Sequence, residues 1–156
     1  MTSQTLLWLE LSHHPAFRVG GWAFVRRSPD ATLSGWAGGE RRVTAERTAL
    51  QALLTALKDV RGPARVLTAA PSVAAIPGRI AAAQAGEDPP SEDLDLWAQA
   101  VTALGRGDID VVRAPQGDRT SAFAAAWAEL GRDRAKDKGP FTSAIPKPNL
   151  AKSGVA

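Results

Sequence analysis

The chain has 156 residues, no cysteine and a 44% hydrophobic composition, so it can bury a sizeable core but offers neither a disulfide framework nor a thiolate metal site. No apolar run is long enough to cross a bilayer, and the first residues, MTSQTLLWLELS, lack the basic region and cleavage site of a signal peptide. These features predict a cytoplasmic protein without membrane association.

The formal net charge of +3 is unevenly distributed. Residues 1–79 carry ten Lys and Arg against five Asp and Glu, whereas residues 80–135 carry five against ten. Residues 1–135 are therefore formally neutral, and the excess positive charge lies in residues 136–156. A polarised surface leaves two interpretations open, because its basic half can attract phosphate groups or can simply be solvated.

Three strand-like segments come first, at residues 6–9, 20–25 and 32–37. Ser28-Pro29-Asp30 has the composition of a turn between the second and third segments, and Gly38-Gly39 is interpreted as a turn after the third. Strands joined by such short connections predict an antiparallel meander.

The later segments alternate between helix and strand patterns. They are a helix capped by Thr44 and ending at Leu57, a strand at 65–68, a helix at 71–83 broken at Pro77-Gly78, a helix from Ser91 to Leu104, a strand at 109–112 and a helix at 120–130. This order predicts an α/β fold with a mixed five-stranded sheet, an antiparallel meander plus parallel strands, flanked by helices. Residues 1–135 form the predicted domain, and residues 136–156 form a basic, proline-containing tail.

Several local motifs, in this order, resemble the ribonuclease H family over residues 5–133. Gly20-Gly21-Trp22-Ala23 looks like the family's Gly-Gly and aromatic strand, and residues 44–57 look like its first helix. Val66-Leu67-Thr68-Ala69 is similar to the family's fourth strand, which usually ends Thr-Asp-Ser. Asp95-Leu96-Trp97 is similar to the family's Asp-Leu-Trp helix, and residues 119–124 are similar to its final helix. The resemblance implies a ribonuclease H-like fold.

Enzymes of that family use four carboxylates to hold two Mg²⁺ ions, which suit hard oxygen ligands. In this sequence the four positions fall on Glu10, Ala49, Ala69 and Ser121, or on Ala122 in place of Ser121 if the register shifts by one residue. The family's mobile-loop histidine falls near Pro115. The resemblance therefore implies a pseudoenzyme with no catalytic residues, no bound metal and no cofactor.

A rival register takes Glu46 as the helix carboxylate. It moves the position by three residues, puts the Ala/Leu pattern out of phase with the core, and still leaves no acid at Ala69. The family's Asn-Asn pair, which contacts RNA 2′-hydroxyls, falls on Ala45-Glu46, and the Glu46 carboxylate would repel phosphate.

Other residues suggest binding rather than catalysis. His13-His14 with Glu10 form a possible metal set, although neighbouring side chains on a strand point to opposite faces. The five tryptophans could stack on bases, but their apolar surroundings favour a core role. The candidate nucleic-acid contacts are Arg41, Arg42, Arg47 and Arg113. The alternative is that these arginines are only solvated surface residues.

The tail contains apolar residues among prolines and lysines, which is compatible with a disordered tail or with a segment that docks on a partner through Phe141, Ile145 and Leu150. The sequence as a whole predicts a catalytically inactive binding or scaffolding module with a protein partner. The alternative is a non-catalytic module for RNA, DNA or a hybrid, and an active metal-dependent nuclease for RNA–DNA hybrids is less favoured.

Overall fold

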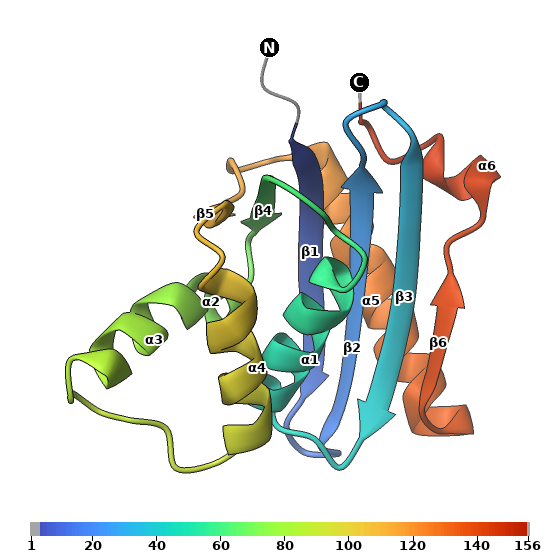
Figure 1. Cartoon of the computed structure of the whole chain (residues 1–156). Coiled ribbons are helices and arrows are strands. Elements are labelled where there is room, and N and C mark those ends of the chain that lie inside the picture. The colour runs from blue at the N-terminus through green and yellow to red at the C-terminus, as the bar shows by residue number, and fades with distance from the viewer. Residues whose placement is uncertain (1–3, 156) are drawn as a thin grey trace.

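The computed structural model describes residues 4–155 and consists of one mixed β-sheet between two layers of helices (Figure 1). The strands are β1 (Thr5–His14), β2 (Val19–Arg27), β3 (Leu33–Arg41), β4 (Ala64–Thr68), β5 (Ile109–Arg113) and β6 (Phe141–Ala144). The helices are α1 (Ala45–Leu57), α2 (Pro71–Ala74), α3 (Ile76–Gln84), α4 (Leu94–Leu104), α5 (Arg119–Lys138) and α6 (Lys147–Leu150).

The sheet has the strand order β5-β4-β1-β2-β3-β6. Strands β1, β2 and β3 form the predicted antiparallel meander, and β4 and β5 run parallel to β1, so the prediction of an α/β fold with a mixed sheet is confirmed. The predicted number of five strands is wrong, because β6 adds a sixth strand antiparallel to β3.

The two faces of the sheet carry separate hydrophobic clusters. Alternate residues of β1 show the division, since Leu7 and Leu9 contribute to the cluster under α1 and α4, whereas Trp8 contributes to the cluster under α5. Figure 1 shows α1 in front of the sheet and α5 behind it. Within residues 4–155, no helix combines the length and apolar character needed to cross a bilayer.

Helix α5 lies directly against the backbone of the meander. The residues that it buries there are small, among them Ala128, Gly131 and Ala135. A Cβ atom added at Gly39 would lie 2.5 Å from the Gly131 carbonyl oxygen and 2.9 Å from the Ala135 Cβ. Glycines on both surfaces therefore allow a helix to approach a sheet more closely than side chains would permit.

Gly38-Gly39 is not a turn but part of β3, which corrects one prediction. A Cβ atom at Gly38 would lie 2.5 Å from Trp22 Cζ2, so the glycine leaves space for the indole of the neighbouring strand. The predicted helix at 71–83 also divides earlier than expected, at Ala75, because Pro77 occupies the first turn of α3, where a proline is tolerated.

Residues 136–156 were predicted to form a tail, but the part that the structure describes belongs to the domain. The predicted boundary after residue 135 falls inside α5, which continues to Lys138 because Ala135 is buried against the sheet. Ile145 and Leu150 are 3% and 4% exposed in the cluster under α5. The Ile145 amide also donates a hydrogen bond to the Gly35 carbonyl, 2.8 Å away, which fixes the segment beside β3.

Candidate functional site

Glu10 is a buried carboxylate in the middle of the sheet. Its position in β1 directs its side chain towards α5, and only 3% of the residue is exposed. The Oε2 atom accepts a hydrogen bond from the Ala69 amide at 2.8 Å and another from the Ser121 hydroxyl. Three of the positions derived from the family resemblance are therefore in direct contact.

The surrounding elements position these donors. Strand β4 runs parallel to β1 with Leu67 opposite Trp8, so the residue after the end of β4 lies beside Glu10. Asp118 caps α5 by accepting a hydrogen bond from the Ser121 amide at 2.9 Å, which places the Ser121 hydroxyl in the first turn, close to the carboxylate.

Burial raises the pKa of Glu10 above its ordinary value of 4.5, because the charged form loses hydration. Hydrogen bonds from Ser121, the Ala69 amide and Thr68 oppose this shift because they stabilise the carboxylate. The balance favours a carboxyl group that is more easily protonated than an exposed glutamate.

The carboxylate borders a cavity of about 600 Å³ that is also lined by Arg113 and by residues 114–118. The donors around the Glu10 carboxylate do not fit a two-metal centre. Two protein hydrogen bonds already reach Oε2, and the Asp118 carboxylate is used as a helix cap. Within residues 4–155, no three side chains of His, Asp or Glu come together as a metal-binding group.

Neither candidate on α1 joins this site. Ala49 is 1% exposed within the cluster on the opposite face of the sheet, whereas Glu10 faces α5. The Glu46 carboxylate forms an ion pair with Arg79 of α3. The Ala49 side chain therefore packs on the face of the sheet opposite the Glu10 carboxylate.

His13 and His14 do not form a metal site with Glu10. The His13 Nε2 atom lies 2.7 Å from the Val43 carbonyl oxygen, and the His14 ring lies against Phe17 with 4.8 Å between the ring centroids. Of the five tryptophans, Trp8, Trp22 and Trp97 are at most 9% exposed, in agreement with the predicted core role.

The four arginines predicted to bind nucleic acid are not clustered. Arg41 donates hydrogen bonds to the Ala135 and Lys136 carbonyls at the end of α5, and Arg47 forms an ion pair with Asp93 at 2.9 Å. Arg42 and Arg113 are exposed, but β3 and β5 are four strand positions apart, a separation of about 19 Å.

The three residues predicted to dock on a partner have intramolecular contacts instead. Ile145 and Leu150 are buried in the chain's own core, and the Phe141 ring lies 4.7 Å from the Arg134 guanidinium carbon. The segment therefore docks on its own domain, and its two most apolar anchors are inaccessible to another molecule.

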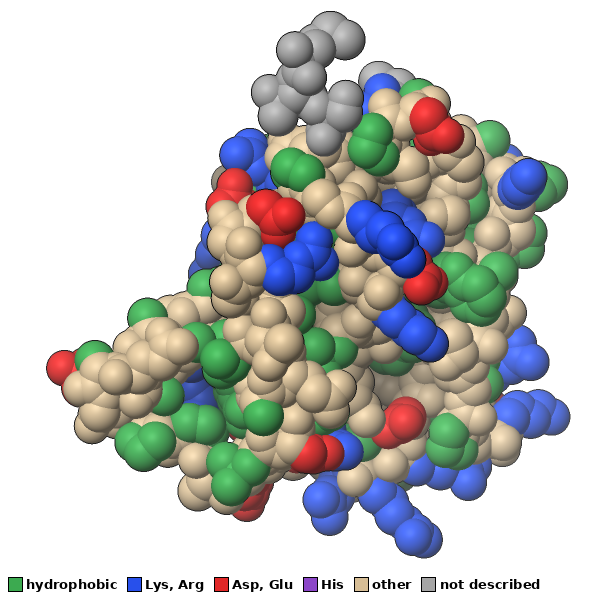
Figure 2. Space-filling model, viewed as in Figure 1, with side chains coloured by type: hydrophobic (Ala, Val, Ile, Leu, Met, Phe, Trp, Pro, Cys, Tyr) green, Lys and Arg blue, Asp and Glu red, His purple; other side chains and the backbone are tan. Residues whose placement is uncertain are grey.

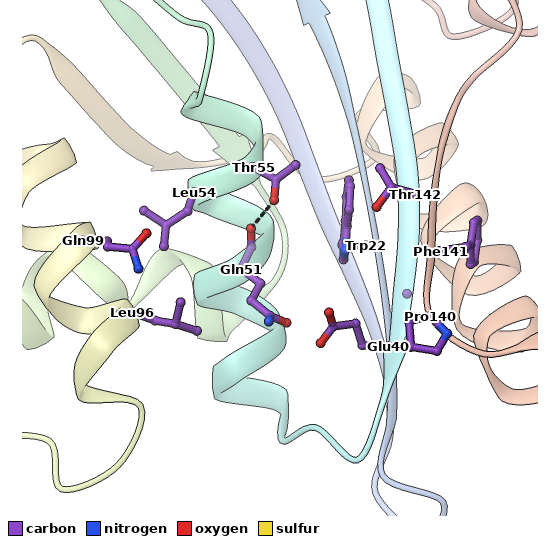
Figure 3. Close-up of a pocket in the computed structure, with 11 residues that line it drawn as sticks. Trp22, Glu40, Gln51, Leu54, Thr55, Leu96, Gln99, Pro140, Phe141 and Thr142 are labelled. Atoms are coloured by element: carbon purple, nitrogen blue, oxygen red, sulfur yellow. Dashed lines mark hydrogen bonds between the residues drawn. The ribbon is translucent and has the colours of Figure 1, made fainter.

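A second site, which sequence reasoning missed, is a cavity of about 460 Å³ between α1, α4, β3 and the start of β6 (Figure 3). Trp22, Leu54 and Leu96 provide apolar surface, and Glu40, Gln51 and Gln99 provide polar groups, whereas the Phe141 ring points away from the cavity (Figure 3). Figure 3 draws the hydrogen bond that the Thr55 hydroxyl donates to the Gln51 backbone carbonyl. The sequence feature that could have indicated this cavity is Gly38-Gly39 followed by the polar Glu40. Had residues 38–40 been interpreted as part of a strand rather than as a turn, Glu40 would have been placed on the sheet beside the cavity.

No protein-family model matches the chain, and no curated protein matches it in sequence.

Proposed function

We propose that the chain is a ribonuclease H-like domain that lacks the metal-dependent reaction and acts as a binding or scaffolding module for a protein partner. The observation that carries this proposal is the bonding of Glu10. Ala69 and Ser121, at two positions where the family has acids, donate hydrogen bonds to the one carboxylate that is left. Through Oε2, Glu10 thus links β1, β4 and α5, and neither Ala69 nor Ser121 adds a second carboxylate beside it.

The topology supports the ribonuclease H-like part of the proposal. A three-stranded meander followed by two parallel strands, with helices on both faces, is the arrangement that the resemblance implies. The extra strand β6 extends the meander at its edge and leaves that arrangement unchanged.

A protein partner is favoured over nucleic acid because the arginines predicted to contact phosphate are divided between separate places. Arg41 and Arg47 already have partners within the chain, and no Lys or Arg of the described part of the chain lines the cavity between α1 and β6. Because Ile145 and Leu150 are buried, contacts from residues 141–150 are limited to exposed side chains such as Lys147.

The test of the pseudoenzyme is an assay for Mg²⁺-dependent cleavage of an RNA–DNA hybrid, combined with calorimetric titration of Mg²⁺. The proposal expects neither cleavage nor saturable binding of Mg²⁺. Cleavage that requires Mg²⁺ and is abolished in Glu10→Gln would refute it, since only a functional carboxylate centre would respond in that way.

A second candidate function, nucleic-acid binding, rests on the end of the molecule where the β1–β2 turn, the end of β3 and the end of α5 meet. Lys and Arg side chains gather along this lower edge in Figure 2. Phe17, which is 57% exposed, contributes a ring that lies 3.8 Å from Lys136 Nζ. Lys138 and Arg42 belong to the same end of the fold.

Titration with an RNA–DNA hybrid, duplex DNA and structured RNA separates the two functions. The measurements are made at about 50 and 200 mM salt, because phosphate contacts weaken steeply over that range. The protein-binding module predicts no binding to any of the three. Binding that falls with salt and is lost in Arg42→Ala and Lys138→Ala would establish the nucleic-acid module instead.

A further inference from the structure

The cavity between α1 and β6 contains one charged group, the Glu40 carboxylate. Among residues 4–155, no Lys, Arg or His side chain forms an ion pair with it. Its sequence neighbour Arg41 is directed to the other side of the sheet, where it donates to carbonyls of α5. A half-buried carboxylate in a concave site, with no cation of its own, is complementary to a cationic ligand group.

The walls of the cavity favour a planar cation on an aliphatic stem. Leu54 and Leu96 offer apolar surface for methylene groups, the Gln51 side-chain amide adds a hydrogen-bond acceptor on the side of Glu40, and the Gln99 amide adds another farther along the cavity (Figure 3). A guanidinium group has five donors and pairs with a carboxylate in a bidentate geometry. An arginine side chain therefore uses these acceptors more fully than an ammonium group, which acts as a point charge.

A nucleobase fits this cavity less well. The Trp22 ring is only 6% exposed because it lies over Gly38, so little of its face is available for stacking. Among residues 4–155, no Lys or Arg lines the cavity to hold a phosphate. These contacts separate a peptide from a nucleotide as the occupant.

The cavity continues into a second hollow of about 670 Å³ along α1 and α4, because the two share Leu54, Thr55 and Gln99. The second hollow is mainly apolar and ends at Lys58. From Gln51 to Lys58 the helix rises about 10 Å, which is the length of about three residues of extended peptide. Figure 2 shows the surface hollowed beside an acidic side chain in this part of the view.

We propose that this groove binds an extended peptide segment of the partner, with an arginine at Glu40, an apolar residue over Leu54 and an acidic residue at Lys58. The proposal rests on the proposed protein-binding function and specifies the surface that it uses. Opposite charges at the two ends of the groove set the direction of the peptide as well as its composition.

The experiment is an NMR titration of the full chain with the tripeptide acetyl-Arg-Leu-Asp-amide, up to about 10 mM because so small a ligand is expected to bind weakly. We expect saturable shifts of the Trp22 indole N–H and of the side-chain amides of Gln51 and Gln99. Replacing the peptide arginine by citrulline, which has the same shape but no charge, should weaken binding about tenfold.

Glu40→Gln should weaken binding of the arginine peptide by a similar, about tenfold, factor. The matched control is Glu129→Gln, an exposed acid on α5 behind the sheet, which should bind as the wild type does. The absence of saturable shifts, shifts centred elsewhere, or equal affinity for the citrulline peptide would overturn the proposal. If one of these results is found and the protein also binds no nucleic acid, this groove is rejected as the peptide site but the protein-binding module is not. If the protein binds nucleic acid in the titration, the protein-binding module itself is rejected.

Discussion

Gly21 offers the sharpest test of how closely α5 lies on the sheet. A Cβ atom at this position would lie 2.8 Å from the Arg132 Cα and still closer to the Ala128 carbonyl oxygen. Ordinary contacts begin at 3.4 Å, so the nearest backbone atoms of α5 would have to retreat by about 1 Å or more in Gly21→Ala. Because the obstructing atoms belong to the backbone, rotation of a side chain cannot relieve the clash.

Overpacking of a core usually costs about 1–3 kcal/mol, and we expect Gly21→Ala to reach about 3 kcal/mol, since a whole helix must move. In a chain of this size such a loss lowers the melting temperature by about 6–12 °C. The assay is urea unfolding followed by circular dichroism and by tryptophan fluorescence, with agreement between the two probes taken as evidence of a two-state transition.

Gly78→Ala provides the matched control, because a Cβ atom at this helical position meets nothing within 4 Å. The same substitution there should stabilise the protein by about 0.5–1 kcal/mol, through the lower entropy of the unfolded chain. Opposite signs at the two glycines are the expected result. If the free energy of unfolding of Gly21→Ala lies within about 0.5 kcal/mol of the wild-type value, the close approach of α5 to the sheet is refuted.

Three further substitutions test the buried carboxylate and the docked segment. Because burial raises the pKa of Glu10, the free energy of unfolding of the wild type should fall as the pH rises from 4.5 through the folded-state pKa, by up to about 1.4 kcal/mol per pH unit. Glu10→Gln should lack this loss. Urea midpoints that change in parallel for the two proteins from pH 4 to 8 would contradict the prediction. Leu150→Ala truncates a side chain that is 4% exposed, so it should lower the free energy of unfolding by about 2–5 kcal/mol and remove hydrogen-exchange protection from β6. The control Leu130→Ala, at a position that is 57% exposed, should change neither quantity. Gly35→Ala puts a Cβ atom 2.8 Å from the Phe24 carbonyl oxygen and 2.9 Å from Leu150 Cδ2, and should cost about 1–3 kcal/mol. Leu150→Ala removes only the second of these contacts, so the cost should be smaller but not zero in that background, and strict additivity in the double mutant would count against the contact with Leu150.

Local patterns were sufficient to predict the order and type of most elements. The apolar run of β1 and the Thr44 cap of α1, whose hydroxyl accepts from the Arg47 amide at 3.0 Å, are features of neighbouring residues and can be identified without the fold. The contact between Ala69 and Glu10 could also be predicted from the sequence, because the predicted topology places β4 parallel to β1 and next to it.

Features that depend on distant contacts were not accessible in the same way. Ile145 is buried because its main chain pairs with Gly35, 110 residues earlier in the sequence, and no local pattern specifies that partner. Gly38-Gly39 has the composition of a turn, and only the indole of Trp22 on the adjacent strand explains why glycine is needed within β3. The cavity beside Glu40 is assembled from five separate elements, so no single segment predicts it.

The pairing of β6 with β3 sets the order in which the molecule can be completed during its synthesis. Ala37 pairs with Ser143, so the outer edge of β3 stays uncovered while more than a hundred further residues are added. At ribosomal rates of about 5–20 residues per second, this interval lasts about 5–20 s. During that time β3 exposes unpaired backbone groups next to Trp36, and an edge of this kind can add strands from neighbouring nascent chains. Pairing with β6 covers this edge, so we expect the completed protein to be less prone to strand addition there than the nascent chain.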